Sequence, residues 1–115
     1  MHIYGIPNCD TVKKARAWLD EHGIKAEFHD YKKQGVPLEV LKKAAKQLGW
    51  ELLINKKGPT WRKQPDEMKE SITTEKAAFD FLQAAPSAIK RPLLEVNGKY
   101  HLGFSSEHYQ GIFKK

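Results

Sequence analysis

Cys9 is the only cysteine in the chain, and its position in the sequence favours a reactive thiol. The apolar run at residues 3–6 predicts a buried strand that stops at Pro7, and a helical period takes over from about Asp10. Cys9 is therefore expected at the start of a helix, where unpaired backbone N–H groups and the helix dipole favour a negative charge. In such positions the pKa of a cysteine falls from about 8.5 to roughly 3.5–7.5. The alternative is a buried, inert cysteine.

A single cysteine restricts the chemistry to a monothiol mechanism. The Cys9 thiolate would attack a disulfide or an oxidised substrate, and an external thiol would resolve the mixed disulfide that results. Glutathione is the natural candidate for that thiol, since its two carboxylates suit a basic protein. A chain without an internal disulfide also agrees with a reducing compartment.

Length and composition describe an ordinary globular domain. The chain has 115 residues, of which 40% are hydrophobic and 30% charged. No apolar run approaches the roughly 18–20 residues of a membrane span, and the N-terminus reads as a strand instead of a secretion signal. We therefore expect a cytoplasmic protein that does not bind a membrane.

The net charge of +6 comes largely from lysine pairs dispersed along the sequence. Dispersed pairs are typical of solvated surfaces, so we expect no nucleic-acid partner. The five histidines show no metal-ligand spacing, and the sequence has no Gly-rich phosphate loop or dinucleotide fingerprint. We expect no metal and no bound cofactor.

The elements that would position Cys9 form two groups at the ends of the chain. At the N-terminal end a helix, residues 10–22, separates strands 3–6 and 26–31, which predicts a βαβ unit with parallel strands. At the C-terminal end Asn97-Gly98 separates two alternating runs, 92–96 and 99–102, and predicts a hairpin with a type I′ turn. An amphipathic helix is expected after Ser105-Ser106.

The segment between these groups reads as helical. Pro37 opens a helix that continues to Gly49, and another begins at Thr73 or Thr74 and closes at Pro86. Three shorter segments lie around them: an ambiguous run at 50–54, a loop at 55–60 that leads through 61–63 into one short helix at 66–70, and a helical turn at 87–90.

This order predicts an α/β fold: a thioredoxin-like βαβ–ββα core with a helical insertion between the second and third strands. We expect a single domain over residues 1–115, with the core at 1–34 and 87–115 and the insertion at 35–86.

Two segments carry a resemblance to a known family. IYGIPNCDT at residues 3–11 resembles the strand–loop–helix opening of the ArsC/Spx family, and IKRPLLEV at 89–96 is similar to that family's Arg-Pro-containing strand start. The likeness covers essentially the whole chain. It is greatest to the bacterial subgroup called YffB, which also has a run like WRK at 61–63 and is regarded as glutathione-dependent thiol reductases.

The resemblance implies roles for three residues. Cys9 is the nucleophile, Arg91 approaches the anion or thiolate, and Pro92 is a cis proline that faces the active cysteine. From the residues alone, Arg91 is equally well a surface arginine that caps the preceding turn.

The family also implies two alternatives. Members that reduce arsenate have further arginines near the positions of Asn55 and Gly103-Phe104 here. A single guanidinium binds a multiply charged oxyanion poorly, because both the charge and the bidentate hydrogen bonds come from guanidinium groups. The Spx regulators bind RNA polymerase and switch through Cys-x-x-Cys, whose second cysteine is Val12 in this chain. An arsenate reductase and a Spx-like regulatory module remain as alternatives.

Four further residues are candidates for substrate or glutathione binding. Asn8 and Thr11 would cap the helix or donate hydrogen bonds to the thiolate, and capping is the preferred interpretation. Lys13 would add positive charge or be solvated, and Arg62 would contact glutathione or belong to a basic loop beside Trp61. The sequence thus predicts a glutathione-dependent monothiol reductase that acts as a monomer on a small-molecule or protein disulfide.

Overall fold

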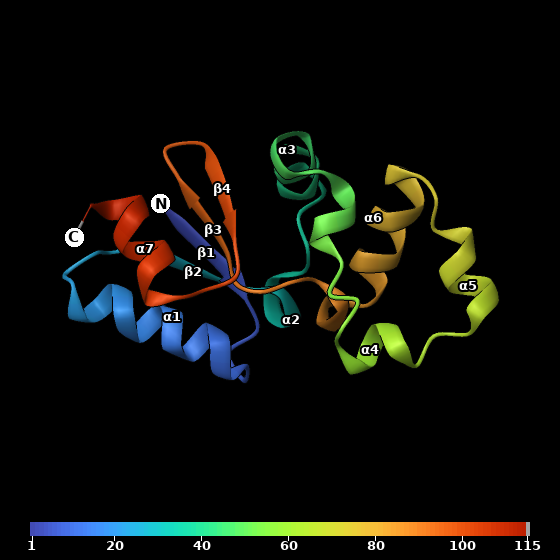
Figure 1. Cartoon of the computed structure of the whole chain (residues 1–115), viewed down its shortest axis with the longest axis horizontal. Coiled ribbons are helices and arrows are strands. Elements are labelled where there is room, and N and C mark those ends of the chain that lie inside the picture. Colours follow the sequence, from blue (N-terminus) through green and yellow to red (C-terminus); the bar gives the residue numbers. More distant parts are fainter. Residues whose placement is uncertain (115) are drawn as a thin grey trace. The chain divides into compact units, whose positions relative to one another are not determined.

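The computed structural model describes residues 1–114, and the chain divides into two compact units (Figure 1). The first, called here the sheet unit, comprises Met1–Asp30 and the chain from Arg91 onward. The second, called the helical unit, comprises Tyr31–Lys90. The sheet unit contains Cys9.

The sheet unit contains a four-stranded mixed sheet in the order β2-β1-β3-β4. β1 pairs in parallel with β2 and antiparallel with β3, and β3 and β4 form an antiparallel hairpin. The parallel βαβ unit and the hairpin are confirmed, and with them the thioredoxin-like arrangement. The strands are β1 (His2–Gly5), β2 (Glu27–Asp30), β3 (Leu93–Val96) and β4 (Lys99–Leu102).

Helices α1 (Asp10–Glu21) and α7 (Ser106–Phe113) lie on the same side of the sheet (Figure 1). The helical spacing of apolar residues in α1 produces one buried stripe, and the strand side chains beneath it alternate between the two faces of the sheet. Full burial of a large apolar side chain contributes about 1.5–3 kcal/mol, so this cluster fixes α1 against β1 and β3. Its buried members are Ile3, Ala15, Trp18, Leu19, Leu94 and Tyr109.

The hairpin turn has the predicted chemistry. Asn97 and Gly98 both have positive φ, 51° and 83°, as a type I′ turn requires. The Glu95 carboxylate accepts a hydrogen bond from the Gly98 N–H at 2.8 Å and lies 3.1 Å from His2 Nδ1. These two interactions hold the pKa of Glu95 below its usual value.

The helical unit consists of short helices. Its elements are α2 (Tyr31–Gln34), α3 (Leu38–Leu48), the 3₁₀ turn η1 (Trp50–Leu53), α4 (Pro59–Arg62), α5 (Asp66–Ser71), α6 (Glu75–Ala84) and the 3₁₀ turn η2 (Pro86–Ala88). The two main helices are confirmed: α3 ends at Gly49, which has φ 92°, and the Thr74 hydroxyl caps α6 by accepting a hydrogen bond from the Ala77 N–H.

Two predicted boundaries are wrong. The second strand is shorter than residues 26–31, because Tyr31 begins the one-turn helix α2. The loop predicted at 55–60 ends before Pro59, which begins α4 because proline is well tolerated in the first turn of a helix. The short helix predicted at 66–70 is confirmed as α5.

The ambiguous run at 50–54 is a 3₁₀ turn followed by a single β-bridge between Ile54 and Ile89. Two backbone hydrogen bonds of 2.8 Å flank the bridge, from the Asn55 N–H to Ala88 and from the Lys90 N–H to Leu53. They hold the start of the segment that leads into Arg91 against η1.

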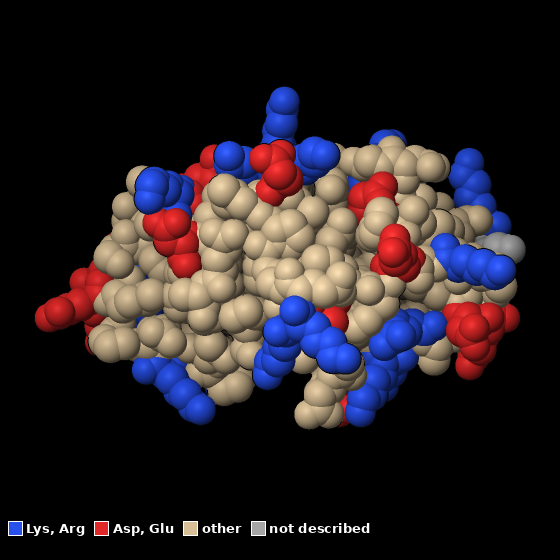
Figure 2. All heavy atoms as spheres, turned by 180° about the vertical axis from the view of Figure 1, so that it is seen from behind, with Lys and Arg blue, Asp and Glu red and all other residues tan. Residues whose placement is uncertain are grey.

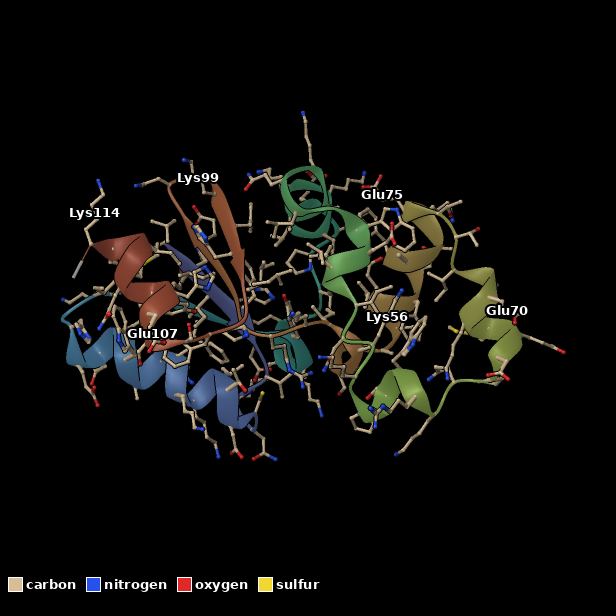
Figure 3. The ribbon with its side chains drawn as sticks, in the orientation of Figure 1. Lys56, Glu70, Glu75, Lys99, Glu107 and Lys114 are labelled. Atoms are coloured by element: carbon tan, nitrogen blue, oxygen red, sulfur yellow. The ribbon has the colours of Figure 1, made fainter. Side chains whose placement is uncertain are left out.

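Charged side chains are spread over the surface. On the face seen in Figure 2, lysine and arginine are interspersed with aspartate and glutamate. Figure 3 shows Lys99 and Lys114 pointing away from the sheet unit and Glu70 pointing away from the helical unit. No helix among residues 1–114 has the length and apolar character needed to cross a membrane.

Tyr109 is fully buried in the sheet unit, where its ring packs edge-on against Phe104 and Trp18 at centroid distances of 4.7 and 5.6 Å. Burial raises the pKa of this phenol, and its hydroxyl has no hydrogen-bond partner among the described residues. A buried hydroxyl without a partner loses its hydration without compensation.

Tyr109→Phe should therefore leave the free energy of unfolding unchanged or raise it by up to about 1 kcal/mol, because it removes the hydroxyl and keeps the ring. Urea denaturation measures the change. Tyr109→Ala, which removes the ring as well, should cost about 3–5 kcal/mol. A loss of more than about 1 kcal/mol in the phenylalanine variant would show that the hydroxyl is satisfied in solution.

Candidate active site

Cys9 lies at the junction of β1 and α1. The strand ends at Gly5, Pro7 and Asn8 form a turn, and Cys9 is the N-cap residue of α1 with extended backbone angles, φ −114° and ψ 126°. Its carbonyl accepts the first helical hydrogen bond, from the Lys13 N–H at 2.9 Å. The predicted position at the start of a helix is confirmed, and the side chain is half-buried.

The surroundings of the Cys9 sulfur favour its charged form. Burial by itself raises the pKa of the thiol, but the backbone N–H groups of Val12 and Thr11, the Arg91 side chain and the Arg91 charge all lower it. The net effect holds the pKa of Cys9 below its usual value. The arrangement therefore stabilises a thiolate that remains partly open to solvent.

The sheet brings Arg91 to Cys9. β3 runs antiparallel to β1 with Tyr4 opposite Leu93, so the residues just before β3 lie at the edge of the sheet where β1 ends. Arg91 and Pro92 occupy that position. The Arg91–Pro92 bond is cis, as the resemblance implied, and Pro92 is buried with its carbonyl accepting a 2.9 Å hydrogen bond from the Gly103 N–H.

The other predicted residues lie in different places. Asn8 and Lys13 are exposed in the sheet unit, before and within the start of α1, and Arg62 is exposed at the end of α4 in the helical unit. The expectation that Asn8 or Thr11 caps α1 is wrong, because Cys9 is the N-cap residue and no side chain makes a capping hydrogen bond there. Thr11 reaches the sulfur through its backbone N–H.

The contribution of Val12 was missed from the sequence. Its side chain is fully buried in the core, and its backbone N–H lowers the pKa of Cys9. The signal that predicts it is its distance from the N-cap, since the N–H groups two and three residues into a helix point back toward the capping position.

Within residues 1–114, no three His, Cys, Asp or Glu side chains gather as a metal site.

Comparison with known proteins identifies similar chains over both units. A model of the ArsC family matches residues 4–112. A solved YffB protein is 42% identical, with 95% of each chain covered and a TM-score of 0.88. An arsenate reductase-related protein from Brucella melitensis is 45% identical, covering 100% of this chain and 97% of its own with a TM-score of 0.76. An uncharacterized protein from Haemophilus influenzae is 42% identical over 111 residues, or 96% of each chain.

The hydrogen bond and charge of Arg91 predict that Arg91→Gln raises the pKa of Cys9. The rate of alkylation by iodoacetamide follows the thiolate fraction, so its inflection with pH should move to higher pH. Ultraviolet absorbance of the thiolate, recorded over the same pH range, gives an independent value.

Lys14→Gln is the matched control, because it removes a positive charge from an exposed position of α1 that is not among the groups that lower the pKa of Cys9. The control should leave the inflection almost unmoved. Equal shifts in the two variants would mean that general charge, and not the Arg91 contact, holds the thiolate.

Proposed function

Because the chain belongs to the ArsC family, which includes arsenate reductases, we propose that it is a glutathione-dependent monothiol reductase with Cys9 as its nucleophile. One observation carries the proposal: the Cys9 sulfur lies at the start of α1 against two backbone N–H groups and the Arg91 side chain. Groups that stabilise a thiolate over a thiol supply both the nucleophile of a disulfide exchange and the leaving group of its second step.

In the first step, the Cys9 thiolate attacks the glutathione sulfur of a mixed disulfide between a substrate and glutathione. A bond forms between Cys9 and glutathione, the substrate sulfur departs as a thiolate, and that thiolate takes a proton from water. In the second step, the thiolate of a second glutathione attacks the bound glutathione sulfur. Glutathione disulfide is released and the Cys9 thiolate is regenerated. Overall, one glutathione thiol is consumed, and its oxidation supplies the two electrons that reduce the substrate sulfur to a thiol.

Arg91 is assigned two roles in this cycle. Its guanidinium stabilises the Cys9 thiolate before attack and again as it leaves, and it is placed to bind a carboxylate of glutathione. Asn8, Thr11 and Lys13 surround the start of α1 and are proposed to contact the substrate there. Arg62, in the helical unit, is proposed to contribute to glutathione binding.

A disulfide suits this site better than arsenate. The chain has three arginines, of which Arg16 and Arg91 belong to the sheet unit. The Arg16 guanidinium lies over the Phe28 ring at 4.0 Å from its centroid, which leaves Arg91 as the arginine that contacts Cys9. One guanidinium matches a thiolate or one carboxylate, whereas a doubly charged oxyanion is better held by several.

The proposal includes the setting in which the reaction would occur. Glutathione acts as co-substrate without a bound cofactor, the partner is a small-molecule or protein disulfide, and neither nucleic acid nor membrane takes part. The chain would act as a monomer in the cytoplasm, where glutathione keeps thiols reduced.

Cys9→Ser should abolish glutathione-dependent reduction of a mixed disulfide, such as that of hydroxyethyl disulfide with glutathione, because a serine hydroxyl is not ionised at neutral pH. A coupled assay with glutathione reductase measures turnover. Mass spectrometry of the wild-type chain after incubation with glutathione disulfide should show one glutathione attached at Cys9.

Circular dichroism of Cys9→Ser checks that the fold is retained, since the oxygen is close in size to the sulfur it replaces. Turnover near the wild-type rate in the serine variant would rule out Cys9 as the nucleophile. A wild-type chain that forms no mixed disulfide would rule out glutathione as its partner.

A further inference from the structure

Gly5 ends β1 at a point where the first turn of α1 passes very close. A Cβ atom built on Gly5 would lie 2.8 Å from Cγ2 of Val12 and 3.3 Å from its Cγ1. Carbon atoms in packed interiors approach to about 3.5–4.0 Å, so no side chain fits at this position without a displacement. The φ angle of Gly5 is outside the left-handed region, and space alone therefore requires glycine here.

Val12 has little freedom to move aside. Its side chain is fully buried, and a β-branched residue in a helix is held in one strongly preferred rotamer. Gly5 is itself fixed in the sheet, where it pairs with Asp30 of β2. A methyl group at residue 5 would therefore push the first turn of α1 away from β1 instead of rotating the valine.

The backbone N–H of the same residue, Val12, lies three residues into the helix from the N-cap Cys9 and lowers the pKa of its thiol. The Val12 side chain packs against Gly5. Displacement of Val12 would weaken the effect of its N–H on the sulfur, because such interactions fall off steeply with distance and angle.

We propose that Gly5 is a positioning residue for Cys9: its missing side chain lets the first turn of α1 approach β1 closely enough for the Val12 N–H to contact the sulfur. The inference rests on the proposed function, in which the thiolate is the nucleophile. Gly5 contacts neither the substrate nor the sulfur, but by this proposal it helps to set the reactivity of the Cys9 thiol.

Gly5→Ala tests the proposal in the full-length chain. The pKa of Cys9, measured by thiolate absorbance and by the pH dependence of alkylation, should rise, and the alkylation rate below neutral pH should fall by about threefold or more. Gly111→Ala is the matched control, because a Cβ at this helical position of α7 would meet nothing within 4 Å. The control should leave the pKa and the alkylation rate unchanged.

The double variant Gly5→Ala/Val12→Ala separates positioning from stability. A Cβ at residue 5 would lie 3.7 Å from the Cβ of residue 12, an ordinary contact, so the double variant should recover the low pKa. Val12→Ala alone should keep the low pKa, since the N–H belongs to the backbone, while its melting temperature falls because two buried methyl groups are lost. A merely structural role for Gly5 would give pKa values that follow the melting temperatures.

A folded Gly5→Ala with the wild-type pKa would overturn the proposal, and so would a folded double variant whose pKa stays high. If Gly5→Ala does not fold, a double variant that folds with a low pKa supports the steric coupling, and one that does not fold overturns it. None of these measurements needs glutathione. A low wild-type pKa without glutathione turnover would therefore overturn the proposed function alone, and an unchanged pKa in a folded Gly5→Ala would overturn only the role of Gly5.

Discussion

The site depends on holding a negative sulfur at a place where burial opposes the charge. A half-buried Cys9 loses hydration, which by itself raises the pKa of the thiol. Interactions with the Val12 and Thr11 N–H groups and with Arg91 outweigh that effect and lower the pKa of Cys9. The charged form of the sulfur therefore depends on these groups acting together.

The backbone N–H groups and the Arg91 side chain that stabilise the thiolate come from different parts of the sequence. The N–H groups of Thr11 and Val12 belong to the first turn of the helix that begins at Cys9, and the position of that turn depends on its close packing against Gly5 of β1. Arg91 is remote in sequence and reaches the sulfur only because β3 pairs with β1 in the register that sets Leu93 opposite Tyr4. A shift of one residue in that register would turn the side chains of β3 to the other face and move Leu94 out of the core.

The parts of this structure that the sequence predicts are those in which local chemistry and the hydrophobic pattern agree. Asn97-Gly98 specifies its turn because both residues must adopt positive φ, and α3 shows a full apolar stripe between Pro37 and Gly49. The one-turn helices α2 and α4 were missed because four residues are too few to display a helical period. Tyr31 was assigned to the second strand because aromatic residues favour strands and α2 is too short to show a helical pattern of its own.

The candidate site was predictable in its side chains and not in its backbone. The side chains of Cys9 and Arg91 can be recognised as reactive from the sequence. Every residue except proline has a backbone N–H, so the identity of residue 12 as valine does not indicate that its N–H acts on the sulfur. The need for glycine at residue 5 is equally hidden, since it arises from the distance between β1 and α1.

Partial exposure of the sulfur is the feature that a monothiol mechanism requires. Deeper burial would strengthen each hydrogen bond to the thiolate, because the local dielectric constant would fall, but it would raise the desolvation cost and close the path to the sulfur. A chain with one cysteine must admit two different molecules in turn, the disulfide substrate and the thiol that resolves the mixed disulfide formed on Cys9. Stabilisation by backbone N–H groups and a guanidinium is compatible with this requirement, because the Cys9 side chain stays half-buried while its pKa is lowered.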